Sequence, residues 1–339
     1  MKLIKTEDAV GHILCHDMTQ IIKDEYKGAR FKKGHIVTKE DIPVLLSMGK
    51  ENLFVWEKKE GMLHENDAAL ILCDICKNEY MISSDVSEGK IELKAETDGL
   101  FLVDTKRLNK INSIDEIMIA TRKGNTKVKK GDKLCGTRVI PLVIDEEKLN
   151  KAKAVYSGKP ILELIPFTIK KAGVITTGNE VYSGRIEDKF TPVIINKLKE
   201  YSIDVVEHIT VDDNCENIVN AIKTMRNIKV ELILCTGGMS VDPDDNTPGA
   251  IKKSGANIVT YGAPVLPGAM FLLGYFDDDV PIVGLPGCVM YAKATVFDLV
   301  LPKIAADVKL KKNDFVIMGE GGLCLSCVEC TYPLCPFGK

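Results

Sequence analysis

The sequence contains little that would point to a membrane protein, a secreted protein or a nucleic-acid-binding protein. No apolar run reaches the ~18 residues that a bilayer-spanning helix needs, and the first residues lack the apolar core of a signal peptide. The formal net charge is −3, so the chain offers no concentrated basic face for the phosphates of a nucleic acid. We therefore expect a cytoplasmic protein that binds neither a membrane nor a nucleic acid.

Histidine is also scarce, with five residues in a chain of 339. Those of the first half (His12, His16, His35 and His64) are not spaced from carboxylates as metal ligands usually are, so we expect surface or packing roles for them. The remaining composition is that of an ordinary globular protein, with 45% apolar residues. The length allows two or three domains.

The first half, residues 1–165, has the short strands and polar turns of an α+β region. Strands expected between 89 and 144 are separated by glycine and aspartate turns, which favours a small β-barrel or sandwich over a Rossmann-type layer. A helix is expected to open with Thr38 as its cap, and others to cover 65–80 and 145–157. Cys73 and Cys76 lie one turn apart in the second of these helices, where core packing is favoured over redox or metal chemistry.

From Lys171 onward, strands and helices alternate in the pattern of a doubly wound α/β sheet. Thr191-Pro192 and Thr247-Pro248 are predicted to begin helices as N-cap and first-turn proline, and Asp213 with Glu216 to form a capping box. Glycine turns follow three of the predicted strands. Since open α/β sheets bind ligands at the C-terminal ends of their strands, these turns predict one binding crevice.

The turn after the strand 232–236 is the clearest candidate for a site. Gly237 and Gly238 can bring backbone N–H groups close to a phosphate, and Asp242, Asp244 and Asp245 follow. Carboxylates can hold a divalent cation that partly neutralises a phosphate. The pattern predicts a loop that binds an anion and a metal ion.

Four motifs follow one another in this half: Thr177-Gly178-Asn179-Glu180, then Thr236-Gly237-Gly238-Met239-Ser240-Val241 leading to Asp245, then Pro267-Gly268, then Gly284-Leu285-Pro286-Gly287. In this order and spacing they resemble the molybdopterin-binding domain of the molybdenum-cofactor biosynthesis proteins, the MoeA/MogA type that includes gephyrin. The resemblance covers about 171–305. It implies a three-layer α/β domain with a mostly parallel sheet over 168–306, which binds the pterin phosphate. In the molybdotransferase branch it also implies Mg²⁺-dependent insertion of molybdate into adenylylated molybdopterin, with release of AMP.

The resemblance also implies roles for individual residues. Asp245, Glu180 and Asp188 fall on acidic positions of the family and are expected to serve catalysis, with Asp245 also as a metal ligand. The positions expected to bind molybdopterin are Thr177, Gly178, Gly237, Gly238, Ser240, Pro267, Gly268, Pro286 and Gly287.

Three positions depart from the family pattern. Leu266 and Ala269 stand where the molybdotransferases usually carry lysines, and Phe190 replaces a small polar residue. The alternative to a molybdotransferase is therefore a non-catalytic molybdopterin carrier or maturation factor that serves a recipient molybdoenzyme. A related nucleotide pyrophosphatase is a third hypothesis, against which the motif 284–287 argues. The resemblance leaves homodimerisation open.

The Cys-rich tail, residues 315–339, indicates separate chemistry. Cys324-x2-Cys327-x2-Cys330-x4-Cys335 resembles the ferredoxin run with one additional residue before the last cysteine, and four thiolates this close can satisfy a tetrahedral metal. An iron–sulfur cluster is slightly favoured over a structural zinc ion, and an unliganded tail is the alternative. The scattered cysteines are expected to be buried apolar residues: Cys15, Cys135, Cys215, Cys235 and Cys288.

Overall fold

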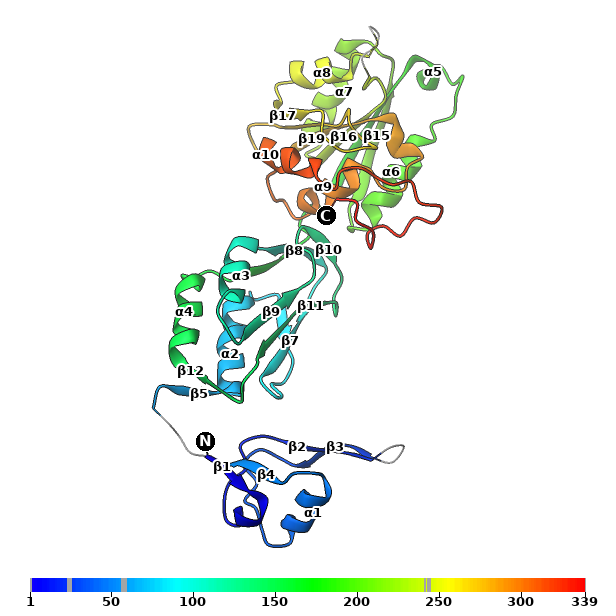
Figure 1. Cartoon of the computed structure of the whole chain (residues 1–339). Coiled ribbons are helices and arrows are strands. Elements are labelled where there is room, and N and C mark those ends of the chain that lie inside the picture. The colour runs from blue at the N-terminus through cyan, green and yellow to red at the C-terminus, as the bar shows by residue number, and fades with distance from the viewer. Residues whose placement is uncertain (1, 23–25, 56–59, 241, 243–244, 339) are drawn as a thin grey trace. The chain divides into compact units, whose positions relative to one another are not determined.

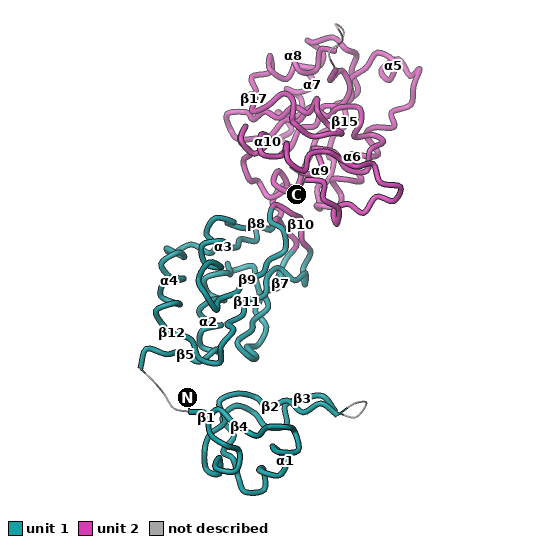
Figure 2. The backbone as a smooth tube through the Cα atoms, viewed as in Figure 1, with its two compact units in different colours: residues 1–97, 101–124, 129–164 teal, residues 98–100, 125–128, 165–339 magenta. Residues whose placement is uncertain are grey.

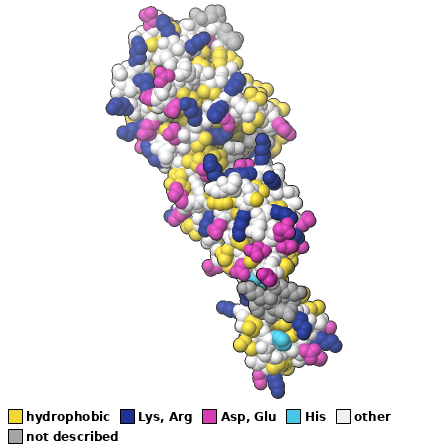
Figure 3. All heavy atoms as spheres, turned by 90° about the vertical axis from the view of Figure 1, so that its left-hand side faces the viewer, with side chains coloured by type: hydrophobic (Ala, Val, Ile, Leu, Met, Phe, Trp, Pro, Cys, Tyr) yellow, Lys and Arg dark blue, Asp and Glu magenta, His cyan; other side chains and the backbone are white. Residues whose placement is uncertain are grey.

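The computed structural model describes residues 2–22, 26–55, 60–240, 242 and 245–338. The chain divides into two compact units (Figure 2): residues 1–97, 101–124 and 129–164 form unit 1, and residues 98–100, 125–128 and 165–339 form unit 2. No helix in the described part of the chain is long and apolar enough to cross a membrane. Acidic and basic side chains alternate over the face seen in Figure 3, as a net charge near zero predicts.

The beginning of unit 1 packs around a small apolar cluster that includes Leu14, Phe31 and Leu45. The helix predicted to open at Thr38 begins at Asp41 instead, because Thr38 does not cap it. The backbone N–H of Thr38 donates to Asp41 Oδ2 at 2.8 Å, and His35 Nε2 lies 2.7 Å from the same oxygen. The elements here are β1 (Lys2–Lys5), η1 (Thr6–Asp8), β2 (Met18–Ile22), β3 (Tyr26–Phe31), α1 (Asp41–Ser47) and β4 (Asn52–Val55).

The middle of the chain forms open sheets with helices beside them, so the described residues form no closed barrel, which corrects that part of the expectation. One four-stranded sheet has the order β6-β7-β11-β9 and one three-stranded sheet the order β10-β8-β13. Helix α2 buries Cys73 and Cys76 as predicted. The elements are β5 (Met62–His64), α2 (Glu65–Cys76), β6 (Met81–Ser83), β7 (Lys90–Ala95), β8 (Gly99–Val103), α3 (Thr105–Asn112), β9 (Ile117–Thr121), β10 (Thr126–Val128), β11 (Lys133–Val139), β12 (Val143–Asp145), α4 (Glu146–Tyr156) and β13 (Leu162–Pro166).

Unit 2 is built on a six-stranded sheet of order β15-β14-β16-β19-β18-β17. Strands β15, β14, β16 and β19 are parallel, while β18 is antiparallel to both of its neighbours. Its elements are β14 (Lys171–Thr177), α5 (Asn179–Tyr182), α6 (Phe190–Lys199), β15 (Asp204–Val211), α7 (Cys215–Asn227), β16 (Leu232–Thr236), α8 (Thr247–Lys253), β17 (Asn257–Tyr261), β18 (Leu272–Tyr275), β19 (Pro281–Leu285), η2 (Gly287–Met290), α9 (Val296–Ala305), α10 (Lys312–Val316) and η3 (Ile317–Gly319).

Helices cover both faces of this sheet, which confirms the three-layer, mostly parallel architecture (Figure 1). Helices α7 and α8 lie on one side, and α6, α9 and α10 on the other. The apolar stripe of α7, with Ile218, Ile222 and Met225, is buried in the core against the sheet. Each such side chain contributes about 1.5–3 kcal/mol through burial. Every residue of β16 and β19 is buried, as in parallel strands covered on both sides.

Helix α8 begins at Thr247 as predicted, and α6 begins at Phe190, one residue before the predicted cap. Neither Thr191 nor Thr247 acts as an N-cap, so these predicted caps are wrong. The side chain that caps α7 is Asn214, not Asp213. After β19 the chain forms a short 3-10 turn, η2, followed by α9 with Thr295 as its cap. Among the scattered cysteines, Cys15, Cys135 and Cys235 are buried, whereas Cys215 and Cys288 are only half-buried.

Candidate functional site

The three predicted turns lie at one edge of the sheet of unit 2. Residue pairing in the sheet places Thr176 of β14 beside Thr236 of β16, and Thr236 beside Leu285 of β19. These are the last residues, or the last but one, of three adjacent parallel strands. The chain segments after Thr177, Thr236 and Leu285 therefore leave the sheet side by side, as the sequence pattern predicts.

The Gly237–Gly238 turn has a backbone conformation that favours glycine. Gly237 has φ +85° and Gly238 has φ +54°. A Cβ atom at Gly237 would lie 2.1 Å from the carbonyl oxygen of Thr177. The close approach of two strand ends thus needs glycine here. Within the described part of the chain, the backbone N–H groups of Gly237, Gly238 and Ser240 have no hydrogen-bond acceptor, so they are available to an anion.

Two threonines fix this turn from below. The hydroxyls of Thr177 and Thr247 lie 3.1 Å apart, and the N–H of Thr247 donates to the carbonyl oxygen of Gly238 at 3.3 Å. Both threonines are buried. Met239 packs beneath the turn onto β19, where a Cβ atom at Gly284 would lie 2.5 Å from its Cε. Gly284 therefore allows the turn to rest directly on the sheet, which holds its N–H groups in place.

Asp188 lies in a polar network beside the end of β14. Its carboxylate accepts hydrogen bonds from the Thr191 hydroxyl at 2.6 Å and from the Thr176 hydroxyl at 3.1 Å. The backbone N–H groups of Phe190 and Thr191 donate to it at 2.8 and 3.0 Å. Burial alone would raise the pKa of Asp188, but these hydrogen bonds outweigh it and lower the pKa. Asp188 thus holds the start of α6 against β14.

His208 belongs to the same network. Its Nε2 lies 2.9 Å from the Thr176 hydroxyl and 3.4 Å from Asp188 Oδ2, and its side chain is 34% exposed. His208 is a residue of this edge that the sequence pattern does not single out. Its position near the end of β15 could have placed it at this edge of the sheet. The sequence pattern predicts Thr191 and Thr247 to be helix caps, which does not reveal their hydrogen bonds to Asp188 and Thr177.

The acidic residues at this edge repel one another. Burial raises the pKa of Asp213, and the neighbouring charges of Glu180, Asp245 and Asp212 raise it further. Asp213 accepts a hydrogen bond from the N–H of Asn179 at 2.9 Å, directly before Glu180. The structure thus brings Glu180, Asp213 and Asp245 into one electrostatic neighbourhood.

The predicted acidic residues differ in exposure. Glu180 is exposed, Asp245 is half-buried, and Asp242 is exposed, with its carbonyl oxygen 2.9 Å from the N–H of Asp245. Asp244 lies outside the described residues, as does Val241. Among the residues that the structure describes, no three histidine, cysteine, aspartate or glutamate side chains are already grouped as metal ligands.

The remaining predicted positions lie before β18 and after β14, β16 and β19. Pro267 and Gly268 precede β18, and a Cβ atom at Gly268 would lie 2.7 Å from Val296 Cγ1, so this loop packs on the start of α9. Pro286 is buried, whereas Gly287 is exposed with open space around it. Ser240 is exposed and Gly178 has φ +139°. The backbone of Leu266 pairs with the tail, accepting from the N–H of Cys324 at 2.8 Å.

The comparisons with known proteins agree with this description. Residues 173–306 match a family described as a probable molybdopterin binding domain, and residues 3–57 match a domain of unknown function (DUF8806). A CinA-like protein of Thermotoga maritima is 36% identical over 85 residues, which is 25% of this chain and 21% of that protein. A CinA-like protein of Mycobacterium leprae is 32% identical over 84 residues, 24% of this chain and 19% of that protein. The matched segment thus spans about a fifth of the length of these curated relatives.

Solved structures are similar to about two fifths of the chain. The protein CinA from Thermoplasma acidophilum is 19% identical, with a TM-score of 0.35, and covers 40% of this chain and 98% of its own. The molybdopterin biosynthesis enzyme MoaB from Thermus thermophilus is 18% identical, with a TM-score of 0.34, and covers 42% of this chain and 99% of its own. All four motifs of the sheet edge lie within residues 173–306, the part of the chain that matches the probable molybdopterin binding domain.

Proposed function

We propose that this protein binds molybdopterin at the sheet edge described above and inserts molybdate into adenylylated molybdopterin, releasing AMP. The observation that carries the proposal is the Gly237–Gly238 turn, whose N–H groups are available to an anion. The acidic residues Glu180, Asp213 and Asp245 lie near this turn. The family match at residues 173–306 supports the class of ligand. The molybdate-inserting activity rests on the resemblance in motifs and on the acidic residues near the turn.

Different residues of the chain would bind the pterin phosphate and the metal ion. The N–H groups of Gly237, Gly238 and Ser240 would bind the terminal phosphate of the pterin, held in position by Thr177 and Thr247 beneath. Asp245, Glu180 and Asp213 offer the hard oxygen ligands that Mg²⁺ prefers, and the raised pKa of Asp213 indicates negative charge that a cation would relieve. Bound Mg²⁺ would neutralise the phosphate and molybdate oxygens. Asp188 acts differently, because its carboxylate is already occupied by four hydrogen bonds within the fold.

A carrier or maturation factor that serves a molybdoenzyme is the second candidate, and the Leu266 position favours it. The molybdotransferases usually have a lysine there, whereas Leu266 is 55% exposed and its backbone pairs with the tail. The neighbouring Ala269 also lacks a charge. A carrier needs tight binding without turnover, so the two candidates differ in one measurable product.

The test is incubation of the full chain with adenylylated molybdopterin, Mg²⁺ and molybdate. We expect release of AMP that depends on both Mg²⁺ and molybdate. Tight pterin binding without AMP would identify a carrier, and absence of pterin binding would refute both candidates.

Asp245→Asn tests the role of the acidic loop. We expect kcat to fall by about 10²–10³, the effect of removing one group that stabilises charge in a transition state, with pterin affinity nearly retained. Asp242→Asn is the matched control, since Asp242 is an exposed aspartate three residues away. Equal loss of binding and turnover in Asp245→Asn would show a structural role instead.

A further inference from the structure

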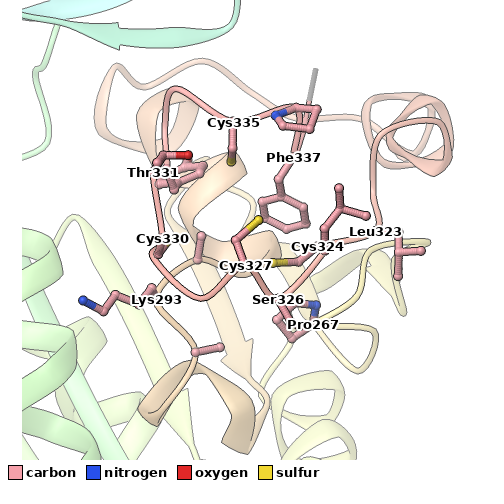
Figure 4. A pocket seen from close by; sticks show the side chains of 15 residues that line it. Pro267, Lys293, Leu323, Cys324, Ser326, Cys327, Cys330, Thr331, Cys335 and Phe337 are labelled. Atoms are coloured by element: carbon pink, nitrogen blue, oxygen red, sulfur yellow. The ribbon is translucent and has the colours of Figure 1, made fainter.

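The four cysteines of the tail line a single cavity in unit 2. Its volume is about 230 Å³, and Pro267 and Lys293 contribute to its wall. Figure 4 shows the sulfurs of Cys324, Cys327 and Cys335 turned toward the space that the tail encloses. Cys324 and Cys335 are half-buried, while Cys327 and Cys330 are exposed. The four cysteines lie close together in the sequence, and the fold places them around one cavity.

The two ends of the tail are anchored to the domain. The N–H of Cys324 donates to the carbonyl oxygen of Leu266 at 2.8 Å, and Gly338 packs on Leu299 of α9, where an added Cβ atom would lie 2.3 Å from Leu299 Cδ2. Phe337 is 4% exposed, and the Tyr332 hydroxyl donates to the carbonyl oxygen of Asp298 at 3.1 Å. These contacts fix the position of the cavity.

The middle of the tail is held much less firmly. Side chains from Leu325 to Thr331 are exposed, and apolar Leu325 and Val328 face solvent. In the part of the chain that the structure describes, no three of the sulfurs are already grouped as metal ligands. Binding of a metal centre would therefore bring the sulfurs closer together, and the exposed segment 325–331 is the part of the tail with the least packing to oppose such a movement.

We propose that Cys324, Cys327, Cys330 and Cys335 bind a [4Fe–4S] cluster in this cavity. The size of the cavity favours the larger of the two metal centres that four thiolates can hold. A single zinc ion sits about 2.3 Å from each of its four sulfurs, which leaves no space inside the ligand set. A cavity of about 230 Å³ suits a polynuclear cluster with its sulfide ions.

The charge and polarity of the wall also suit such a cluster. Apolar side chains of the wall, among them Pro267, Leu323 and Phe337, would limit access of water to the cluster. Lys293 is the charged side chain among the lining residues, and none of these is acidic. A cluster with four thiolate ligands carries net negative charge, and no carboxylate among the lining residues would repel it. This inference is independent of the ligand proposed for the sheet edge.

Binding can be tested as a ligand exchange that needs no electron transfer. The probe is a synthetic [4Fe–4S] cluster in which each iron carries one small alkyl thiolate. Each cysteine thiol transfers its proton to a departing alkyl thiolate, and its sulfur forms the new bond to that iron. The products are the protein-bound cluster and four alkyl thiols, with the oxidation state of the cluster unchanged.

The experiment uses the full chain under anaerobic conditions, followed by gel filtration. We expect four iron and four sulfide ions per chain, with thiolate-to-iron absorption in the visible range. Cys327→Ser and Cys330→Ser change exposed residues, so the fold should persist, as near-ultraviolet circular dichroism would verify. In both variants the cluster content should fall about 10-fold or more, because loss of a group that only supports a metal's ligands already weakens metal binding by about 10-fold.

Cys215→Ser is the matched control, because Cys215 is a half-buried cysteine of the same unit at the start of α7, outside the tail. It should bind the cluster as the unmodified chain does. Equal iron binding by all variants, or no stable iron in the unmodified chain, would overturn the proposal. A chain that takes up one zinc ion in place of the cluster would overturn it as well.

Discussion

Substitution of Gly237 by alanine tests whether the turn depends on the close approach of two strand ends. Two separate costs are expected. Gly237 has φ +85°, a left-handed conformation that costs a side chain about 1–2 kcal/mol. The added Cβ would lie 2.1 Å from the carbonyl oxygen of Thr177 and 2.9 Å from its hydroxyl, and forced overpacking costs about 1–3 kcal/mol. The sum is about 2–5 kcal/mol.

The assay is thermal unfolding of the full chain followed by circular dichroism. A loss of about 2–5 kcal/mol should lower Tm by about 4–20 °C in a domain of this size class. Gly249→Ala is the matched control, since Gly249 lies in helix α8 with nothing within 4 Å of an added Cβ. Alanine there should leave stability unchanged or raise it by up to about 1 kcal/mol. A Gly237→Ala variant with the same Tm as Gly249→Ala would refute the reasoning.

Two further predictions concern pH. The lowered pKa of Asp188 means that its ionised carboxylate stabilises the fold above the unfolded pKa of about 3.9, and that this contribution is lost as pH falls through the lower folded pKa. Urea unfolding of Asp188→Asn should therefore show a smaller loss of stability at acid pH than unfolding of the unmodified chain. Parallel curves of stability against pH would contradict this. The pKa of Asp213 is raised, so its ionised carboxylate destabilises the fold above that raised value, and the effect disappears below the unfolded pKa. Asp213→Asn should therefore raise Tm at pH 7, and the gain should shrink on acidification or on addition of Mg²⁺. A lower Tm at pH 7 would argue against charge repulsion.

The elements of unit 2 could be predicted from the sequence largely because its strands are buried on both faces. Strands such as β16 and β19 are continuous apolar runs that end in glycine turns, so their ends and the common edge were recognisable. The boundary errors have a shared cause. Thr191 and Thr247 resemble helix caps in sequence, but their hydroxyls bind the side chains of Asp188 and Thr177 and do not accept from the N–H groups of a first helical turn.

The first half was harder to predict because its strands are short and half-exposed. Turn spacing indicated strands but could not show which of them pair, so the expected barrel became open sheets. The sequence pattern also identified the cysteines of the tail without their surroundings. The wall that Pro267 and Lys293 contribute comes from segments 30 residues or more away, and only the fold brings them together.

The packing of Met239 on Gly284 has a chemical consequence. Met239 is 4% exposed, and its Sδ would lie only 2.6 Å from a Cβ atom at Gly284. Oxidation of Met239 to the sulfoxide would add a polar oxygen to this buried contact. Gly284 has no side chain that could donate a hydrogen bond to that oxygen. The thioether beneath the Gly237–Gly238 turn is thus a point at which oxidative damage would lift the turn from the sheet without altering any residue that faces the ligand.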